Sequence, residues 1–222
     1  MEKIVISVGG SMINPGKLNL PFLKKLKTIL NKEKKQRQIL IITGGGHLAR
    51  EYMTPLKDQG KDVEDRVGIA CTQLNALLLA SYLKTQKIIP KSLIELKSML
   101  HNQNILICGG FAEDLGTTSD GTAAEIAKAT KATTFINLTN VKGLYTKDPR
   151  KYTDAKFIPK ITHKAFQEII DKHNEKPGQH FVLDQHAAKI CRENTITVII
   201  IKGINNLQKV LEKKTFSGTT IF

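Results

Sequence analysis

Short apolar runs alternate with amphipathic segments along the whole chain. The apolar runs lack polar alternation, which is typical of strands buried on both faces of a parallel sheet. They are Ile4–Val8, Ile39–Ile42, Lys87–Ile89, Ile105–Cys108, Thr134–Leu138 and Ile196–Ile201. Helical spacing is found in Leu20–Leu30, Leu48–Lys57, Val67–Leu83, Leu93–Leu100, Asp120–Ala129, Lys164–Ile170 and Ala187–Glu193. This order predicts a three-layer α/β/α sandwich around a mainly parallel sheet.

Neither a repeat nor a linker interrupts this pattern, and 222 residues suit one domain. We therefore expect a single domain over residues 1–222. Tyr145–Lys160 is rich in Pro, Asp and Lys, and predicts a loop with a short hairpin. Asn174–Gln179 predicts an exposed loop.

The formal net charge of +14 favours a nucleic-acid partner at first sight. The cations are 29 Lys and only 5 Arg, whereas base readout favours Arg, and no aromatic residues interleave with them. The densest run, Lys24–Arg37, shares a helix with an apolar face and predicts a solvated surface. We expect no nucleic-acid function.

Cysteine usage and apolar run length bear on the cellular setting. Cys71, Cys108 and Cys191 are isolated in apolar stretches, which indicates buried reduced thiols in a cytoplasmic protein. No apolar run approaches the ~18 residues of a membrane span, and the N-terminus lacks a signal-peptide layout. The six histidines lack zinc-site spacing, so we expect no protein-held metal.

Three glycine clusters each follow a predicted strand and precede a helix. They are Gly9-Gly10-Ser11, Gly44-Gly45-Gly46 and the loop from Gly109 through Gly116 to Asp120. Ligands of open α/β sheets bind beyond the carboxyl ends of strands, where glycine lets backbone N–H groups approach a phosphate. Three such turns predict a polyanion, or two anionic ligands side by side.

The middle cluster also satisfies a dinucleotide-binding pattern, with Asp65 further along as the acidic residue. That acidic residue should end the next strand, but Asp65 opens a helix instead, so we treat the match as accidental. Arg50 lies about one turn into the helix behind the glycines, from which its guanidinium could swing back to an anion. The alternative is a surface arginine.

Residues 116–120 place three hydroxyls and a carboxylate at a helix start. Ser119 or Asp120 could be a plain N-cap, or Thr118 and Ser119 could bond phosphate while Asp120 orients the site. Asp65, also at a helix start, could accept from ribose hydroxyls. The polar segment 139–149 follows a buried strand and predicts a functional loop, in which Tyr145 and Asp148 could frame a base and ribose.

Together these motifs resemble the amino acid kinase superfamily, and within it the archaeal type of uridylate (UMP) kinase. The resemblance spans nearly the whole chain and rests on the order of its motifs. They are Val8–Ser11, Gly44–Tyr52, Gly68-Ile69 with Leu74–Leu78, the turn at 116–120, Thr139–Val141, Gly143–Tyr145, Lys147–Pro149, Asp184 with Ala187–Ile190, and Gly218–Ile221.

The resemblance implies ATP-dependent phosphorylation of UMP to UDP in pyrimidine biosynthesis, with Mg²⁺ carried by ATP, in a homohexamer. It divides the chain into an acceptor side, 1–130, and an ATP side, 131–222. It assigns UMP to Gly45, Asp65, Phe111, Gly116, Thr117, Thr118 and Ser119. It assigns ATP to Gly9, Gly10, Ser11, Gly46, Arg50, Thr139, Asn140, Tyr145 and Asp148. It places Asp120 and Lys189 near the transferring group.

Four positions, in three segments, depart from the superfamily's usual residues. Ser7 stands where many members carry Lys, Lys142 replaces an Asp, and Gln185-His186 replaces Pro-Leu. Two alternatives therefore stay open: a kinase of this fold with another acceptor (isopentenyl phosphate, a carboxylate or carbamate), and a nucleotide-binding sensor or storage protein without turnover.

Overall fold

The computed structural model of this chain describes residues 1–147, 149, 151–172 and 182–222. Its centre is a seven-stranded sheet in the order β3-β2-β1-β4-β8-β9-β7. The strands are β1 (Glu2–Val8), β2 (Arg37–Thr43), β3 (Ile105–Cys108), β4 (Thr134–Thr139), β7 (Lys160–Ile161), β8 (Thr197–Lys202) and β9 (Gly218–Ile221). All neighbouring strands pair in parallel except β8 and β9. The prediction of a mainly parallel sheet is confirmed.

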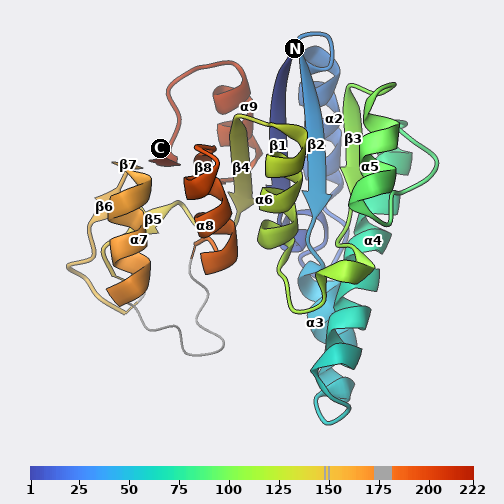
Figure 1. The fold of residues 1–222 in the computed structure, drawn as a ribbon, viewed down its shortest axis with the longest axis horizontal. Coiled ribbons are helices and arrows are strands. Elements are labelled where there is room, and N and C mark those ends of the chain that lie inside the picture. Colours follow the sequence, from blue (N-terminus) through green and yellow to red (C-terminus); the bar gives the residue numbers. More distant parts are fainter. Residues whose placement is uncertain (148, 150, 173–181) are drawn as a thin grey trace.

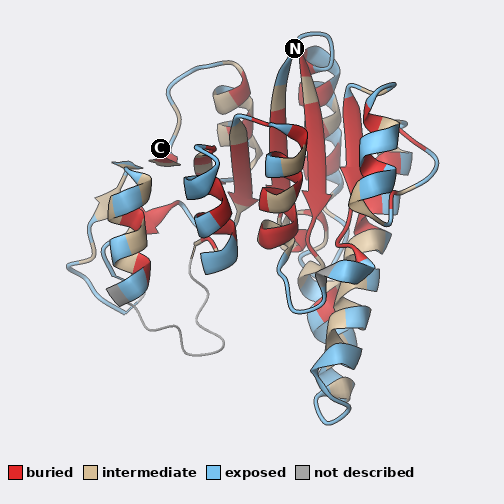
Figure 2. Ribbon diagram, in the orientation of Figure 1, coloured by how far each residue is buried: buried red, intermediate tan, exposed pale blue. Residues whose placement is uncertain are grey.

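Helices cover both faces of this sheet and make the predicted three-layer sandwich (Figure 1). One face packs against α2 (Leu20–Glu33), α4 (Lys61–Leu83) and α9 (Ile204–Leu211), with the short α1 (Gly10–Ile13) at its edge. The other packs against α5 (Leu93–Leu100), α6 (Ser119–Thr130), α7 (His163–Lys172) and α8 (Gln185–Glu193). The strands between the layers are buried nearly throughout (Figure 2).

The strands β1, β2, β3, β4 and β8 run in one direction and end at one edge of the sheet, the lower edge in Figure 1, whereas β7 and β9 run the other way. There α3 (Gly46–Met53) follows β2, and the 3₁₀ turns η1 (Thr54–Leu56) and η2 (Ala112–Asp114) lie in the connections. A separate hairpin of β5 (Leu144–Tyr145) and β6 (Phe157–Ile158) follows β4. This confirms the hairpin expected in 145–160, whereas the loop expected at 174–179 lies outside the described residues.

The strand predicted at Lys87–Ile89 is wrong. No strand forms there, because the side-chain amide of Gln86 occupies the open edge of β3. Gln86 Nε2 donates to the Ile107 carbonyl, and Gln86 Oε1 accepts from the Ile107 amide at 3.3 Å. One glutamine thus replaces the backbone pairing that an edge strand would supply.

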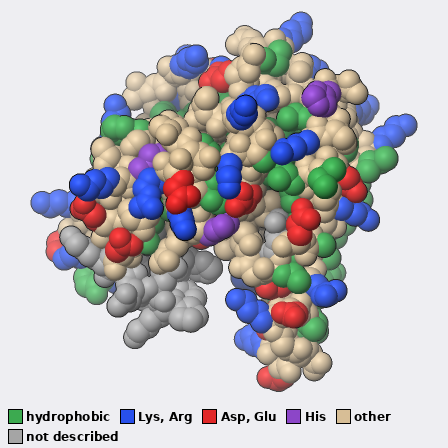
Figure 3. Space-filling view, in the orientation of Figure 1, with side chains coloured by type: hydrophobic (Ala, Val, Ile, Leu, Met, Phe, Trp, Pro, Cys, Tyr) green, Lys and Arg blue, Asp and Glu red, His purple; other side chains and the backbone are tan. Residues whose placement is uncertain are grey.

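Two further sequence-based placements need correction. Helix α4 begins at Lys61, so Asp65 lies within the helix and does not open it. Arg37 ends the lysine-rich run but is buried in β2, where it pairs with Glu33 at 2.8 Å and Glu2 at 3.3 Å. The lysines of α2 do lie opposite its buried apolar face, and cations are dispersed among acidic side chains on the face drawn in Figure 3.

Two properties bear on the expected cellular setting. Cys71, Cys108 and Cys191 are all buried, as predicted. Among the residues described, no helix is both long and apolar enough to cross a membrane.

Candidate functional site

The glycine turns after β1, β2 and β3 lie side by side, because these three strands are neighbours in parallel register. The first two turns touch. A Cβ built on Gly10 would lie 2.4 Å from the Gly44 carbonyl oxygen and the Gly46 amide nitrogen. Gly46 also has φ +64°, a conformation that favours glycine. Glycine is therefore needed here for backbone packing, in addition to any approach of a phosphate.

Helix α4 holds two of these turns in place. The buried Asn75 donates from Nδ2 to the Gly44 carbonyl at 2.8 Å and to the Gly45 carbonyl at 3.2 Å. One turn earlier, Thr72 Oγ1 accepts from the Gly110 amide at 2.7 Å. The sequence analysis assigned no role to Asn75 or Thr72, although a polar residue inside an otherwise apolar helical stretch was a usable signal.

Arg50 is the fifth residue of α3, and it is exposed. The helix begins at Gly46 with Gly45 as its N-cap, so its first N–H groups point toward the glycine turns. The placement of Arg50 one turn behind these glycines is confirmed. Whether its guanidinium reaches an anion there stays a prediction.

The loop 111–119 leads from the third turn to α6 and is tied to α4. Asp65 Oδ2 accepts from the Gly116 amide at 2.8 Å, which joins two segments that the resemblance assigns to one ligand. Gly116 and Thr117 are exposed, and the Ser119 hydroxyl lies beside the Gly44 turn. The Phe111 side chain is buried in the core, so its backbone is the part left to contact a ligand.

Thr118 is the N-cap of α6, and this corrects the expectation of Ser119 or Asp120 as the cap. Its hydroxyl accepts from the Gly121 amide at 3.1 Å and donates to Asp184 Oδ2. Asp184 in turn caps α8, accepting from the Ala187 amide at 2.7 Å. The two helix N-termini are thereby linked through one hydroxyl and one carboxylate, and the Thr118 hydroxyl is already engaged.

Asp120 follows in the first turn of α6 and is partly buried beneath the glycine turns. Its Oδ1 accepts from Ser7 Oγ and its Oδ2 from Asn137 Nδ2, both at 2.8 Å. Burial raises the pKa of Asp120 to about 6, the Ser7 hydrogen bond opposes that rise, and the nearby Asp184 carboxylate adds to it. A carboxyl so perturbed, at a helix start that contacts two strands, is typical of functional sites.

The segment after β4 forms the other side of the site. Thr139 ends β4, Asn140 is exposed, and Ser11 lies in α1 beside the first glycine turn. Tyr145 on β5 packs edge-on against Phe157, with ring centroids 5.3 Å apart, and Lys142 Nζ lies 4.7 Å from the Phe157 centroid. Lys142 thus contacts the hairpin through the Phe157 ring. Asp148 lies outside the described residues.

Strand β9 anchors this hairpin. Thr219 Oγ1 accepts from the Leu144 amide at 2.8 Å and donates to the Ile158 carbonyl at 2.6 Å, so it contacts both strands of the hairpin. Gly143 packs against the same side chain: a Cβ built there would lie 2.5 Å from Thr219 Oγ1.

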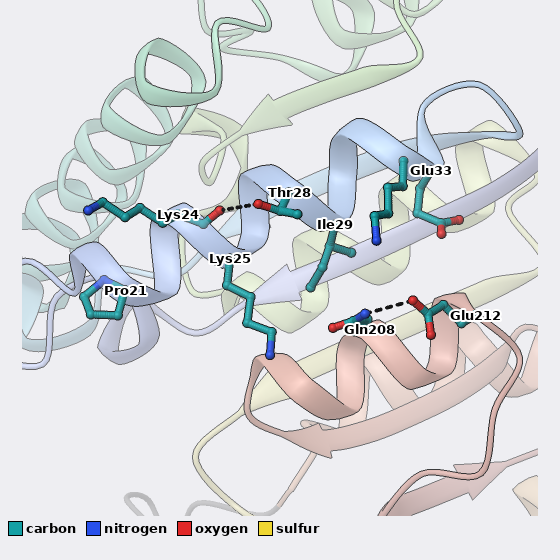
Figure 4. Close-up of a pocket in the computed structure, with 9 residues that line it drawn as sticks. Pro21, Lys24, Lys25, Thr28, Ile29, Glu33, Gln208 and Glu212 are labelled. Carbon is teal, nitrogen blue, oxygen red and sulfur yellow. Dashed lines mark hydrogen bonds between the residues drawn. The ribbon is translucent and has the colours of Figure 1, made fainter.

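Lys189 is exposed on α8. It lines a groove of about 440 Å³ between α7 and α8, together with Gln167, Asp171, Gln185, His186 and Arg192. A second cavity, of about 390 Å³, lies between α2 and α9 and has lysines on its rim (Figure 4). None of the residues that line this second cavity is among the predicted ligand residues.

Comparison with known proteins agrees with this arrangement. Residues 2–202 match the sequence profile of the amino acid kinase family. The chain belongs to this family. Among its relatives, uridylate kinase of Archaeoglobus fulgidus is 34% identical over 224 residues, covering 99% of each chain. Uridylate kinase of Thermoplasma volcanium is also 34% identical, covering 99% of this chain and 97% of its own.

Solved structures of this family give the same result for the fold of the chain. The crystal structure of uridylate kinase from Archaeoglobus fulgidus matches with a TM-score of 0.87 and 31% identity over 100% of both chains. UMP kinase from Ureaplasma parvum matches with a TM-score of 0.79 at 23% identity, over 99% of this chain and 98% of its own.

Proposed function

We propose that this protein transfers the γ-phosphoryl group of ATP to UMP, giving UDP and ADP, as a nucleoside monophosphate kinase of pyrimidine nucleotide biosynthesis. The observation that carries this proposal is full-length similarity to proteins named uridylate kinase, at 34% identity with 99% of each chain aligned for one of them. The adjacent glycine turns support it, because two polyanions must be held side by side.

The acceptor would lie between the second glycine turn and the loop 111–119. The Asp65 carboxylate would accept from ribose hydroxyls, for which its bond to the Gly116 amide sets its position. Phosphate would be held by N–H groups at the start of α6 and by the Ser119 hydroxyl. The proposed acceptor residues are Gly45, Asp65, Phe111 through its backbone, Gly116, Thr117, Thr118 and Ser119.

ATP would lie against the first and second glycine turns and the segment after β4. The proposed ATP residues are Gly9, Gly10, Ser11, Gly46, Arg50, Thr139, Asn140, Tyr145 and Asp148. This gives the division into an acceptor side over 1–130 and an ATP side over 131–222. Gly9, Gly10, Gly46 and Arg50 would then reach ATP from the acceptor-side sequence.

The chemistry needs positioning and charge neutralisation more than proton transfer. An ionised oxygen of the UMP phosphate attacks the γ-phosphorus, a new P–O bond forms, and the bond to the β–γ bridging oxygen breaks with ADP leaving. Backbone N–H groups of the turns and the Arg50 guanidinium would hold the attacking and leaving oxygens in line with the γ-phosphorus and neutralise their negative charge. Asp120 would orient the site, and Lys189 is proposed, by resemblance alone, as a second cation.

Mg²⁺ would enter the site with ATP. Asp120 and Asp184 each already accept a hydrogen bond on both carboxylate oxygens, which suits a cation held by phosphate oxygens and not by a preformed protein cage. Bound in that way, Mg²⁺ would neutralise triphosphate charge.

An acceptor panel tests this function. ATP-dependent ADP release is measured with UMP, CMP, isopentenyl phosphate, carbamate and a simple carboxylate, with and without Mg²⁺. We expect turnover on UMP that disappears without Mg²⁺. Turnover with only one of the other acceptors would show that this compound, and not UMP, is the substrate. Tight nucleotide binding by calorimetry without any turnover would indicate a sensor or storage protein.

We also propose a homo-oligomer, with a hexamer as the expected form. A stripe of small and apolar residues faces outward along α4, opposite its buried face, at spacings of four and three residues. The stripe consists of Val63, Val67, Ala70, Leu74 and Leu77. A second copy of α4 could cover it. Sedimentation should give an oligomer for the wild type and for Ile94→Lys on α5, and a smaller species for Leu74→Lys; equal masses for all three would contradict this surface.

We place the protein in the cytoplasm, for which the free thiols of Cys71 and Cys191 are the supporting observation, since reduced thiols persist there.

A further inference from the structure

Two neighbouring strands present one hydroxyl and one amide to a single carboxylate. Ser7 on β1 and Asn137 on β4 are partners in the parallel register, and both are buried, at 1% and 4% exposure. Their donors reach different oxygens of Asp120, each at 2.8 Å. A carboxylate bonded at both oxygens from a rigid sheet has one favoured orientation.

Asn137 extends this arrangement toward α8. The same Nδ2 also donates to the Val182 carbonyl at 3.1 Å, two residues before the Asp184 cap. The sheet therefore fixes both Asp120 and the backbone that carries Asp184. Among the ion pairs of the described residues, none includes Asp120, so its donors are neutral side chains.

We propose that Ser7 and Asn137 are positioning residues for phosphoryl transfer: they hold the Asp120 carboxylate ionised and in one orientation behind the glycine turns. The inference rests on the proposed kinase function and deepens it. Neither side chain contacts substrate in this assignment; both act through Asp120.

The two donors respond differently to protonation of Asp120. The Ser7 hydroxyl can accept as well as donate, whereas the Asn137 NH₂ group can only donate. A proton on Asp120 would therefore lie on Oδ1 and reverse the Ser7 hydrogen bond, while the Asn137 bond persists. Loss of either donor removes a bond that favours the anion, which raises the proton affinity of Asp120.

Other ionisable groups near Asp120 do not replace this pair. Asp184 raises the pKa of Asp120, and Cys191 on α8 stays neutral because burial and the two carboxylates raise its pKa to about 12. Lys3 on β1 and Arg37 on β2 lie at the opposite ends of their strands. His186 on α8 and Glu125 on α6 face one another at 3.4 Å.

The test measures the titration of the Asp120 carboxyl directly, and its effect on catalysis through the pH dependence of the kinetic constants. Carboxyl-carbon NMR gives the titration of Asp120 in the full-length wild type and in Ser7→Ala, Ser7→Thr and Asn137→Leu, and kcat and KM are measured across pH with ATP and UMP. We expect Ser7→Ala and Asn137→Leu each to bind the Asp120 proton about tenfold more tightly and to shift the acid limb of kcat/KM to higher pH.

At a pH where Asp120 is ionised in every variant, we expect kcat to fall about tenfold in both variants while KM changes less than about twofold. Ser7→Thr, which keeps the hydroxyl, should restore the wild-type titration. An Asp120 titration unchanged in Ser7→Ala and Asn137→Leu would overturn the proposal, as would an equal loss of kcat at every pH.

These outcomes separate the two proposals. If the protein does not phosphorylate UMP but Asp120 titrates at a higher pH in the variants, the proposed acceptor is wrong and the proposed action of Ser7 and Asn137 on Asp120 is supported. If Ser7→Ala does not fold, Asn137→Leu gives the same comparison from the other strand. If Asp120 titrates at the same pH in the wild type and in both variants, the proposed role of Ser7 and Asn137 is wrong, whichever acceptor the protein uses.

Discussion

Gly10 and Gly46 lie in direct backbone contact, although they follow different strands. A Cβ on Gly46 would lie 2.3 Å from the carbonyl carbon of Gly10, and Gly46 also has a positive φ. The turns after β1 and β2 therefore form one packed unit at the edge of the sheet.

Gly46→Ala should destabilise the fold by about 2–4 kcal/mol, through the left-handed backbone and the clash together. Thermal unfolding followed by circular dichroism measures this. Gly60→Ala is the matched control, because Gly60 has φ +94° and nothing within 4 Å of a built Cβ. A loss in Gly46→Ala no larger than in the control would mean that the two turns can separate.

Asn75→Leu should cost about 1–3 kcal/mol, because it leaves the Gly44 and Gly45 carbonyls without a buried donor. The KM for the acceptor should rise as the second turn loosens. Urea unfolding and steady-state kinetics report the two effects. Gln73→Leu removes a single hydrogen bond, of 3.1 Å, to the Gly110 carbonyl and should cost less.

Asp120→Asn should increase stability at about pH 7 by about 1–3 kcal/mol and abolish most activity. The folded pKa, about 6, lies above the ordinary value of 3.8, so the unfolded chain releases this proton first and stability falls as pH rises from about 4 to 6. Below about pH 4 the carboxyl is protonated in both states, and the difference should vanish. Urea unfolding at both pH values checks the sign.

Arg50→Ala and Ser119→Ala should each lower kcat/KM by about 10- to 100-fold if they hold phosphate oxygens. The kcat/KM of Lys189→Ala, measured in the same assay, shows whether this exposed lysine contributes to the reaction. Lys97→Ala removes an exposed cation from α5 and is the control. Unchanged kcat/KM in both Arg50→Ala and Ser119→Ala would refute the proposed anion site.

Cys191 should resist thiol reagents in the folded protein at about pH 8, because its pKa is raised to about 12. Burial also raises the pKa of Cys71, but no carboxylate adds to that effect, so Cys71 should react first. Reaction with a chromogenic disulfide, followed with and without guanidinium, gives the order. Fast labelling of Cys191 in the native state would show that α8 opens readily.

Strongly apolar elements were predictable from local pattern alone. The observed bounds of strands β1 to β4 and of helix α5 match the predicted ones within a few residues. The spacing of apolar residues along each element shows which of its faces are buried, so these elements can be recognised locally. The pattern failed at Lys87–Ile89, where the deciding contact is the Gln86 side chain on β3. It also missed β9, which pairs with β8, the strand before it along the chain, and with β7, which is distant in sequence.

The site was predictable as a set of turns but not as a network. Glycine after a buried strand identified the three turns correctly, yet the contact of Gly10 with Gly46 depends on strand order in space. Ser7 and Asn137 were invisible as a pair, because only the register of β1 with β4 brings them to Asp120. Short polar residues inside apolar strands were the one local signal of that arrangement.

Strand β9 sets the order in which the molecule can be completed. It follows every other strand along the chain, yet it lies between β8 and β7 and bonds the β5–β6 hairpin through Thr219. During synthesis the strands β1 to β4 can assemble as they leave the ribosome, whereas β7 and the hairpin must wait for residues 218–221. The proposed ATP side would therefore be the last part of a nascent chain to take shape.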